Sequence, residues 1–227
     1  MNSFSTPGNI VTGRVEPTLE MVRGYFRDQA RDQQGLAEFR NPHLESPVSA
    51  KVKASAISSA VLIPVVVEDD QLSNVVVTRR HEKIRFGGHM CFPGGRTDAD
   101  ESAITTALRE SEEEIGLNRN DVEVLGCLGD YFTQAGYKIT PVVGLIQSSA
   151  NLNANTDEVS EIHQISFTDM LDSSRYALTR YGEARGHYSF SQGQLRIAGP
   201  TVSVMIGFFE TLLAYRNNKA GDNGLAL

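Results

Sequence analysis

Cysteine is scarce in this sequence, which argues against both a disulfide framework and a cysteine-based zinc site. The 227-residue chain contains only Cys91 and Cys127. Two cysteines form no disulfide framework, and these two lack the spacing of a zinc site. A reducing intracellular compartment is therefore expected.

Long apolar runs and an excess of positive charge are also absent. No window reaches about 18 consecutive apolar residues, and residues 1–17 lack the apolar core of a signal peptide. The 28 acidic and 21 basic residues give a net charge of −7, whereas a nucleic-acid-binding domain would show a basic stripe. We expect a soluble, cytoplasmic protein that binds neither a membrane nor a nucleic acid.

The pattern of apolar residues predicts a mixed α/β fold in one main domain. Residues 1–48 form an N-terminal extension with one helix that begins after Thr18, residues 49–216 form the main domain, and residues 217–227 form a flexible tail. Strands are expected at 59–68, 72–80 (after a turn at Gln71–Asn74), 121–132, 137–147 and 158–167, with a hairpin in 182–199 and a last helix at 201–216.

A glycine-rich loop over 84–100 leads into a predicted helix, residues 100–115, which ends at Gly116. This helix carries Glu110, Glu113 and Glu114, whose spacing of three and four residues places them on one face. Like charges at this spacing repel one another by a few tenths of a kcal/mol per pair. A bare cluster of this kind is more often a solvated acidic face, but Mg²⁺ also prefers carboxylate oxygens.

The residues before the cluster help to decide between a solvated acidic face and a metal site. The stretch GRTDADESAITTALRESEEEIGL resembles the Nudix box, G-x5-E-x7-R-E-U-x-E-E-x-G-U, where U is aliphatic. Eight of the nine fixed positions match: Gly95, Glu101, Arg109, Glu110, Glu113, Glu114, Gly116 and Leu117. Ser111 stands where an aliphatic residue is usual, and we expect it to face the core.

The resemblance implies a Nudix fold, in which a mixed β-sheet lies between helices (α/β/α) and a loop–helix–loop forms the metal site. It also implies a divalent-metal-dependent hydrolase of a nucleoside diphosphate linked to another group. Glu110, Glu113 and Glu114 are then the catalytic metal ligands for Mg²⁺ or Mn²⁺. Glu101 and Arg109 form an ion pair that supports the loop and the helix.

Such chemistry needs no covalent protein nucleophile, because bound metal ions can neutralise the phosphate oxygens and activate water. A carboxylate must still accept the proton from that water. Glu110 can do so, and a downstream acid such as Glu158 is the alternative.

The residues upstream of the box are similar to the coenzyme A pyrophosphatase branch of the family. The pattern L-L-T-x-R-[SA]-x3-R-x3-G-x3-F-P-G-G is filled by Val76, Val77, Thr78, Arg80, Arg85, Gly88, Phe92, Pro93, Gly94 and Gly95. Three features depart from the branch: His81 replaces a small residue, the gap from Arg85 to Gly88 is one residue shorter, and Ala198 stands where tryptophan is typical.

This likeness implies that Arg80, Arg85, Gly94 and Gly95 bind the substrate, since guanidinium groups suit phosphate oxygens. His89 is a further candidate for a phosphate contact. The aromatic residues Tyr131, Phe132 and Tyr137 either stack on adenine or belong to the core. The expected products of coenzyme A or its thioesters are 3′,5′-ADP and a 4′-phosphopantetheine. The alternatives are a pyrophosphatase for ADP-ribose or a dinucleotide and a non-catalytic nucleotide-sensing module. A homodimer is possible.

Overall fold

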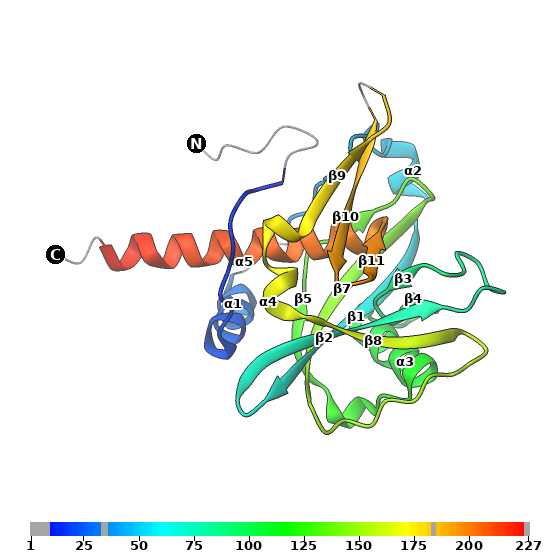
Figure 1. The fold of residues 1–227 in the computed structure, drawn as a ribbon, viewed down its shortest axis with the longest axis horizontal. Helices are drawn as coiled ribbons and strands as arrows, with labels where there is room; N and C mark the ends of the chain where they lie inside the picture. The colour runs from blue at the N-terminus through cyan, green and yellow to red at the C-terminus, as the bar shows by residue number, and fades with distance from the viewer. Residues whose placement is uncertain (1–9, 33–35, 183–184, 225–227) are drawn as a thin grey trace.

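The computed structural model describes residues 10–32, 36–182 and 185–224, and a mixed sheet lies at its centre (Figure 1). Its main path runs β3 (Met90–Cys91), β2 (Gln71–Arg80), β1 (Ile57–Glu68), β7 (Tyr137–Gln147) and β5 (Glu123–Cys127). Three further strands pair with this path: β4 (Gly94–Arg96) with β1, β6 (Tyr131–Phe132) with β7, and β8 (Val159–Ser166) with β2. β1 and β7 run parallel, and all other pairs are antiparallel.

The central strand β1 is buried on both faces, which explains its near-continuous apolar sequence. Successive side chains of a strand point to opposite faces. Ile63 and Val65 therefore enter one core cluster, while Leu62 and Val66 enter the other. The predicted buried strand is confirmed, and it begins two residues earlier than expected.

Helices cover both faces of the sheet, so the predicted α/β/α layering is confirmed. α1 (Leu19–Arg31) and α5 (Pro200–Gly224) lie on one side, and α3 (Ala103–Ile115) lies on the other (Figure 1). α5 continues through most of the range 217–227 that the sequence predicts as a tail. None of the helices in the described part of the chain is long and apolar enough to cross a membrane.

A second sheet of three antiparallel strands follows the first, in the order β11 (Leu195–Ala198), β10 (Gly186–Gln192) and β9 (Tyr176–Arg180). β10 and β11 form the hairpin that the sequence predicts, although residues 183–184 of the predicted range lie outside the described residues. β9 was not predicted. The remaining short elements are α2 (Ala50–Ala54), α4 (Phe167–Met170) and the 3-10 turns Arg119–Asp121 and Ser173–Arg175.

The turn between β1 and β2 differs from the prediction. Glu68 pairs with Gln71, so the turn consists of Asp69 and Asp70, which have φ values of 49° and 59°. The predicted turn at 71–74 is wrong because these residues already belong to β2. Aspartate tolerates the left-handed region better than most residues, and a two-residue turn with positive φ matches the twist of the strands.

Residues 36–46, here called the N-terminal strap, cross the main domain. The Phe39 N–H donates to the Asp130 carbonyl at 2.8 Å, and Leu44 exchanges backbone hydrogen bonds of 2.9 and 3.1 Å with Gly186. The Phe39 ring lies against Gly207 of α5, at a place where a β-carbon would come within 2.5 Å of it. The predicted N-terminal extension thus packs against the domain.

Candidate active site

α3 holds the acidic residues of the predicted site against the sheet. The helix begins after Ser102, whose Oγ accepts the Thr105 N–H at 3.1 Å, and ends at Gly116, whose φ is +64°. The predicted end is confirmed, and the start lies three residues later than predicted. The Ser102 hydroxyl thus satisfies one of the N–H groups that the first turn of a helix leaves without a helical partner.

Arg109 connects the loop before α3 to the helix itself. Its Nε and Nη2 donate to the two carboxylate oxygens of Glu101 at 2.9 and 3.0 Å, so the predicted contact is present in bidentate form. Nη1 donates to Glu110 at 2.9 Å and to Glu113 at 3.1 Å, and Nη2 also reaches the Arg96 carbonyl. Hydrogen bonds from Arg109 lower the pKa of Glu101 to about 2, although burial acts in the opposite direction.

Glu114 is a carboxylate almost without contact to solvent, with 1% of its surface exposed. The Gly94 N–H donates to its Oε2 at 3.1 Å, and Arg80 Nη1 lies 3.5 Å from its Oε1. Burial is the main reason that its pKa rises to about 7, and the charges of Glu110 and Glu158 raise it further.

Gly94 and Gly95 allow this close approach of the loop to the acids. A β-carbon at Gly95 would lie 2.4 Å from the carboxyl atoms of Glu110, and one at Gly94 would lie 2.3 Å from the Ala60 carbonyl. Burial also raises the pKa of Glu110, against hydrogen bonding by Arg109. Both predicted glycines therefore line the wall on which the acids lie.

The glutamates of α3 diverge more than their spacing suggests. The Glu113 side chain is 54% exposed, whereas Glu114 turns into the protein. Glu112 is exposed and pairs with Arg119, as expected of a solvated charge. Ser111 is fully buried, as predicted, and its hydroxyl donates to the Ala107 carbonyl at 2.7 Å.

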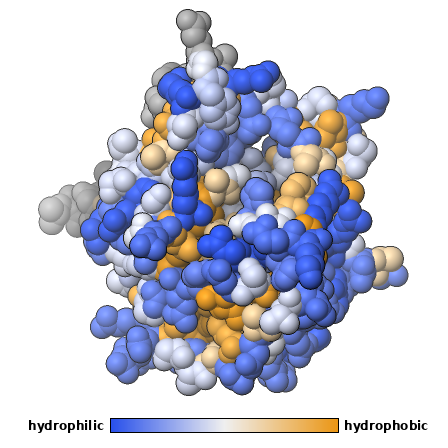
Figure 2. Space-filling view, turned by 45° about the vertical axis from the view of Figure 1, so that its right-hand side comes forward, coloured by the Kyte–Doolittle hydropathy of each residue, from blue (hydrophilic) through white to orange (hydrophobic). Residues whose placement is uncertain are grey.

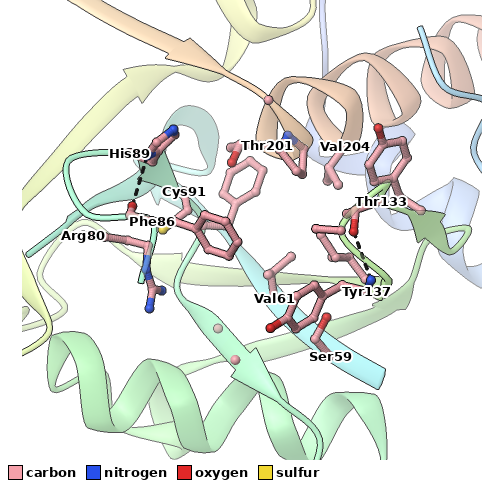
Figure 3. Close-up of a pocket in the computed structure, with 18 of the residues that line it drawn as sticks. Ser59, Val61, Arg80, Phe86, His89, Cys91, Thr133, Tyr137, Thr201 and Val204 are labelled. Atoms are coloured by element: carbon pink, nitrogen blue, oxygen red, sulfur yellow. Dashed lines mark hydrogen bonds between the residues drawn. The ribbon is translucent and has the colours of Figure 1, made fainter. Parts of the chain in front are cut away.

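A cavity of about 810 Å³ opens beside these acids. Figure 3 shows residues that line it. Glu110, Glu114 and Glu158 line it together, and so do the predicted substrate-binding residues Arg80, Arg85, Gly94 and Gly95. The volume falls in the usual range for small-molecule sites. The cavity therefore brings together residues that lie far apart in the sequence.

Most of the remaining cavity wall is apolar. Val61 of β1, Phe92, Ile139 of β7 and Val204 of α5 form much of it, and hydrophobic residues gather along the middle of this side of the molecule, bordered by hydrophilic ones (Figure 2). His43 and Glu45 of the strap also reach the cavity. Sequence reasoning missed the strap and α5 residues because no motif marks them.

The basic residues of the cavity lie on its rim. Arg80 Nε donates to the Arg85 carbonyl at 3.3 Å, and Arg85 Nη1 donates to the Tyr137 hydroxyl at 2.9 Å. His89 also lines the cavity, and its Nδ1 lies 3.1 Å from the Phe86 carbonyl. Tyr137 is half-buried and faces this rim (Figure 3).

The chemistry of the acidic side chains fits a divalent cation. Among the described residues, no three His, Cys, Asp or Glu side chains converge into a ready metal cluster. Glu110, Glu114 and Glu158 nevertheless line one cavity, and the pKa values of Glu110 and Glu114 are raised chiefly by burial. Carboxylate oxygens are the donors that Mg²⁺ prefers, and a cation would stabilise these buried charges.

Comparison with known proteins identifies relatives of this chain. A family model for the NUDIX domain matches residues 57–182. A Yersinia enterocolitica protein named "Uncharacterized Nudix hydrolase NudL" is 36% identical over 154 residues, which cover 66% of this chain and 78% of that protein. A protein of the same name from Photorhabdus laumondii is 34% identical over 152 residues, covering 65% of this chain and 80% of that protein.

Solved structures resemble this chain more distantly. A MutT/nudix family protein from Enterococcus faecalis has a TM-score of 0.47 at 17% identity, covering 88% of this chain and 76% of that one. A MutT protein from Methanosarcina mazei Go1 has a TM-score of 0.45 at 20% identity, covering 72% and 95% of the two chains.

Proposed function

The chain belongs to the Nudix family, and on this premise we propose that it hydrolyses the diphosphate linkage of coenzyme A or of its thioesters. That it is a Nudix pyrophosphohydrolase follows from the family. The choice of substrate is the proposal. Its expected products are 3′,5′-ADP and 4′-phosphopantetheine or the acyl form of the latter.

Enzymes of this family generally use divalent metal ions, and here Mg²⁺ or Mn²⁺ would be held by Glu110, Glu113 and Glu114. When bound, the ion neutralises phosphate oxygens and lowers the pKa of water. Arg109 supports this arrangement by fixing the carboxylates of Glu110 and Glu113 relative to Glu101. A carboxylate buried as deeply as Glu114 is costly unless a cation faces it.

The proton of the attacking water must pass to a carboxylate. Glu110 and Glu158 both line the cavity. Burial is the main cause that raises the pKa of Glu110, and the charges of Glu113 and Glu158 add smaller contributions. A raised pKa makes a carboxylate a better proton acceptor. Glu110 accepts the proton in our proposal, and Glu158 is the alternative.

The cavity has a basic rim and an apolar wall, and this division supports coenzyme A as the substrate. Arg80 and Arg85 lie at the rim, whereas Val61, Phe92 and Val204 lie on the wall. Guanidinium groups bind phosphate, and an apolar wall binds a chain with few polar groups. Coenzyme A combines these parts, because its phosphates are joined to a pantetheine arm with apolar segments.

The same division disfavours ADP-ribose and dinucleotides. Their second half carries several ribose hydroxyls, each of which loses its hydrogen bonds to water on binding. A hydroxyl left unpaired on an apolar wall costs about 1–3 kcal/mol. A sensing module without activity is disfavoured by a different observation, since every acidic residue of the Nudix box is present.

The proposal is tested by comparing kcat/KM for coenzyme A, acetyl-coenzyme A, ADP-ribose and NADH with Mg²⁺ or Mn²⁺. Coenzyme A or its thioester is expected to be the best substrate by at least about tenfold, which corresponds to one unpaired hydroxyl. A preference for ADP-ribose or NADH would overturn the choice of substrate.

The role of the buried acid is tested by Glu114→Gln. We expect kcat to fall on the order of 100-fold or more, because the variant loses a charge at the reaction centre. Glu112→Gln is the matched control on the same helix, since Glu112 is exposed and, within the described part of the chain, its carboxylate pairs with Arg119 alone. Equal activities of the two variants would contradict the assignment of Glu114.

A further inference from the structure

Three side chains, two from strands and one from a loop, converge on the rim of the cavity. Arg85 lies in the loop between β2 and β3, Arg96 ends β4, and Tyr137 begins β7. Arg85 Nη1 and Arg96 Nη2 both donate to the Tyr137 hydroxyl, at 2.9 and 3.0 Å. Both guanidinium groups also lie near the Tyr137 ring, 5.5 and 5.8 Å from its centroid.

These two arginines lack the acidic partners that other arginines of this region have. Arg79 pairs with Glu161, and Arg80 lies beside Glu114. Among the described residues, neither Arg85 nor Arg96 forms an ion pair with a carboxylate. Two positive charges held around one oxygen atom repel each other. An anion bound between them would be attracted by both charges and would offset this repulsion.

The tyrosine adds a third donor to the cluster. Its hydroxyl oxygen accepts both guanidinium hydrogen bonds, and its own proton stays available because a phenol can donate as well as accept. A phosphate group has enough acceptor oxygens for all three groups, and arginine binds it in a fork geometry. The cluster therefore has the donors that a phosphate monoester requires.

The cluster lies apart from the acids, although both face one cavity. Gly94, which touches Glu114, pairs with Val61 of β1, whereas Arg96 pairs with Ser59. Two residues along a strand span about 7 Å. Arg80, which lies beside Glu114, and Tyr137 are on opposite sides of the cavity (Figure 3).

We propose that Arg85, Arg96 and Tyr137 form a second anion site, which binds a phosphate monoester of the substrate separate from the diphosphate that is cleaved. Tyr137 holds the two guanidinium groups in place and donates its own hydrogen bond. This inference rests on the proposed function. In coenzyme A the monoester is the 3′-phosphate, which is attached to the same ribose as the diphosphate and so is one sugar away from it.

The first experiment compares coenzyme A with dephospho-coenzyme A, which lacks only this phosphate. For Tyr137→Phe and Arg96→Met, KM for coenzyme A is expected to rise about tenfold, because each variant loses a charge-assisted hydrogen bond to the phosphate. We expect kcat to change little. KM for dephospho-coenzyme A is expected to stay within about twofold of wild type. Arg119→Met, which removes an equal charge from an exposed ion pair, is the control. Equal losses on both substrates would overturn the second site.

A binding measurement separates this inference from the proposed function. Calorimetry without metal compares adenosine 3′,5′-bisphosphate with 5′-AMP, which differ only in the 3′-phosphate. Wild type is expected to bind the bisphosphate at least about tenfold more tightly, and Arg96→Met is expected to remove this difference. If wild type prefers ADP-ribose as a substrate but still shows the difference, the proposed function fails and the second site stands. Equal binding of the two nucleotides would overturn the second site whichever substrate is cleaved.

Discussion

At the scale of single residues, His43 shows how a position outside every motif becomes part of the site. The side chain is 5% exposed and lines the cavity. The Tyr188 N–H donates to its Nδ1 at 3.0 Å, and its Nε2 lies 3.0 Å from the Ser203 hydroxyl. Because Nδ1 accepts a hydrogen bond, the ring is neutral in the folded protein. Burial accordingly lowers the pKa of His43 below its ordinary value.

This lowered pKa predicts how stability depends on pH. Below about pH 6.5, His43 becomes protonated in the unfolded chain but stays neutral in the folded one. The unfolded state then binds more protons, so the free energy of unfolding falls by up to about 1.4 kcal/mol per pH unit until the folded pKa is reached. Urea unfolding of wild type and His43→Gln between pH 7.5 and 5 measures this, and the variant should lack that part of the slope. Equal slopes in the two proteins would contradict it.

The residues found by sequence reasoning are those whose spacing is fixed by the backbone. The contact between Glu101 and Arg109 and the burial of Ser111 follow from positions along one loop and one helix. The contacts of His43 and of Tyr137 were not predicted, because they depend on how the strap and the strands come together in space. Apolar periodicity carries no information about such pairings.

At the scale of elements, β1 was predictable because a continuous apolar run marks a strand buried on both faces, and α1 was predictable because its apolar residues recur at helical spacing. The turn at Asp69–Asp70 was not, because no glycine marks the positive φ of these two residues. The loop 84–100 contains two short strands, β3 and β4, which have only two and three residues. Strands this short are defined by their partners rather than by their own sequence.

The contact between the strap and α5 predicts opposite effects for two glycines of one helix. Gly207→Ala places a methyl group 2.5 Å from the Phe39 ring, so we expect a loss of about 1–3 kcal/mol in the free energy of unfolding. Gly221→Ala meets no atom of the described residues within 4 Å and should be neutral or stabilising by up to about 1 kcal/mol.

Urea denaturation of the two variants measures the difference. KM should rise only for Gly207→Ala, because displacing Phe39 also displaces His43 and Glu45, which line the cavity. A Gly207→Ala protein as stable as Gly221→Ala would show that the strap is not held by this contact.

At the scale of the whole molecule, residues within 10–32 and 36–48 contribute to the core of the domain. Val15, Val22 and Phe26 are 0%, 0% and 3% exposed and belong to the larger core cluster. Burial of each such side chain contributes about 1.5–3 kcal/mol, which together is a large part of the stability of an ordinary domain.

A protein lacking residues 1–48 is therefore expected to unfold cooperatively only at a much lower temperature, or not at all. Thermal unfolding followed by circular dichroism tests this, with Phe26→Ala as an intermediate case that should lose about 3–5 kcal/mol. A truncated protein that unfolds at the wild-type temperature would support a boundary at residue 48, where the sequence predicts one.

The pairing of α1 with α5 also bears on how the chain acquires its fold during synthesis. The Tyr25 and Tyr215 rings are 5.6 Å apart, and Lys219 reaches Asp28 at 2.9 Å. Residues 19–31 leave the ribosome long before residues 200–224, so the apolar side of α1 has no helical partner while the intervening sheet forms. Contacts of such long range close slowly. The interval before α5 emerges is therefore when nascent chains are most open to aggregation and to chaperones.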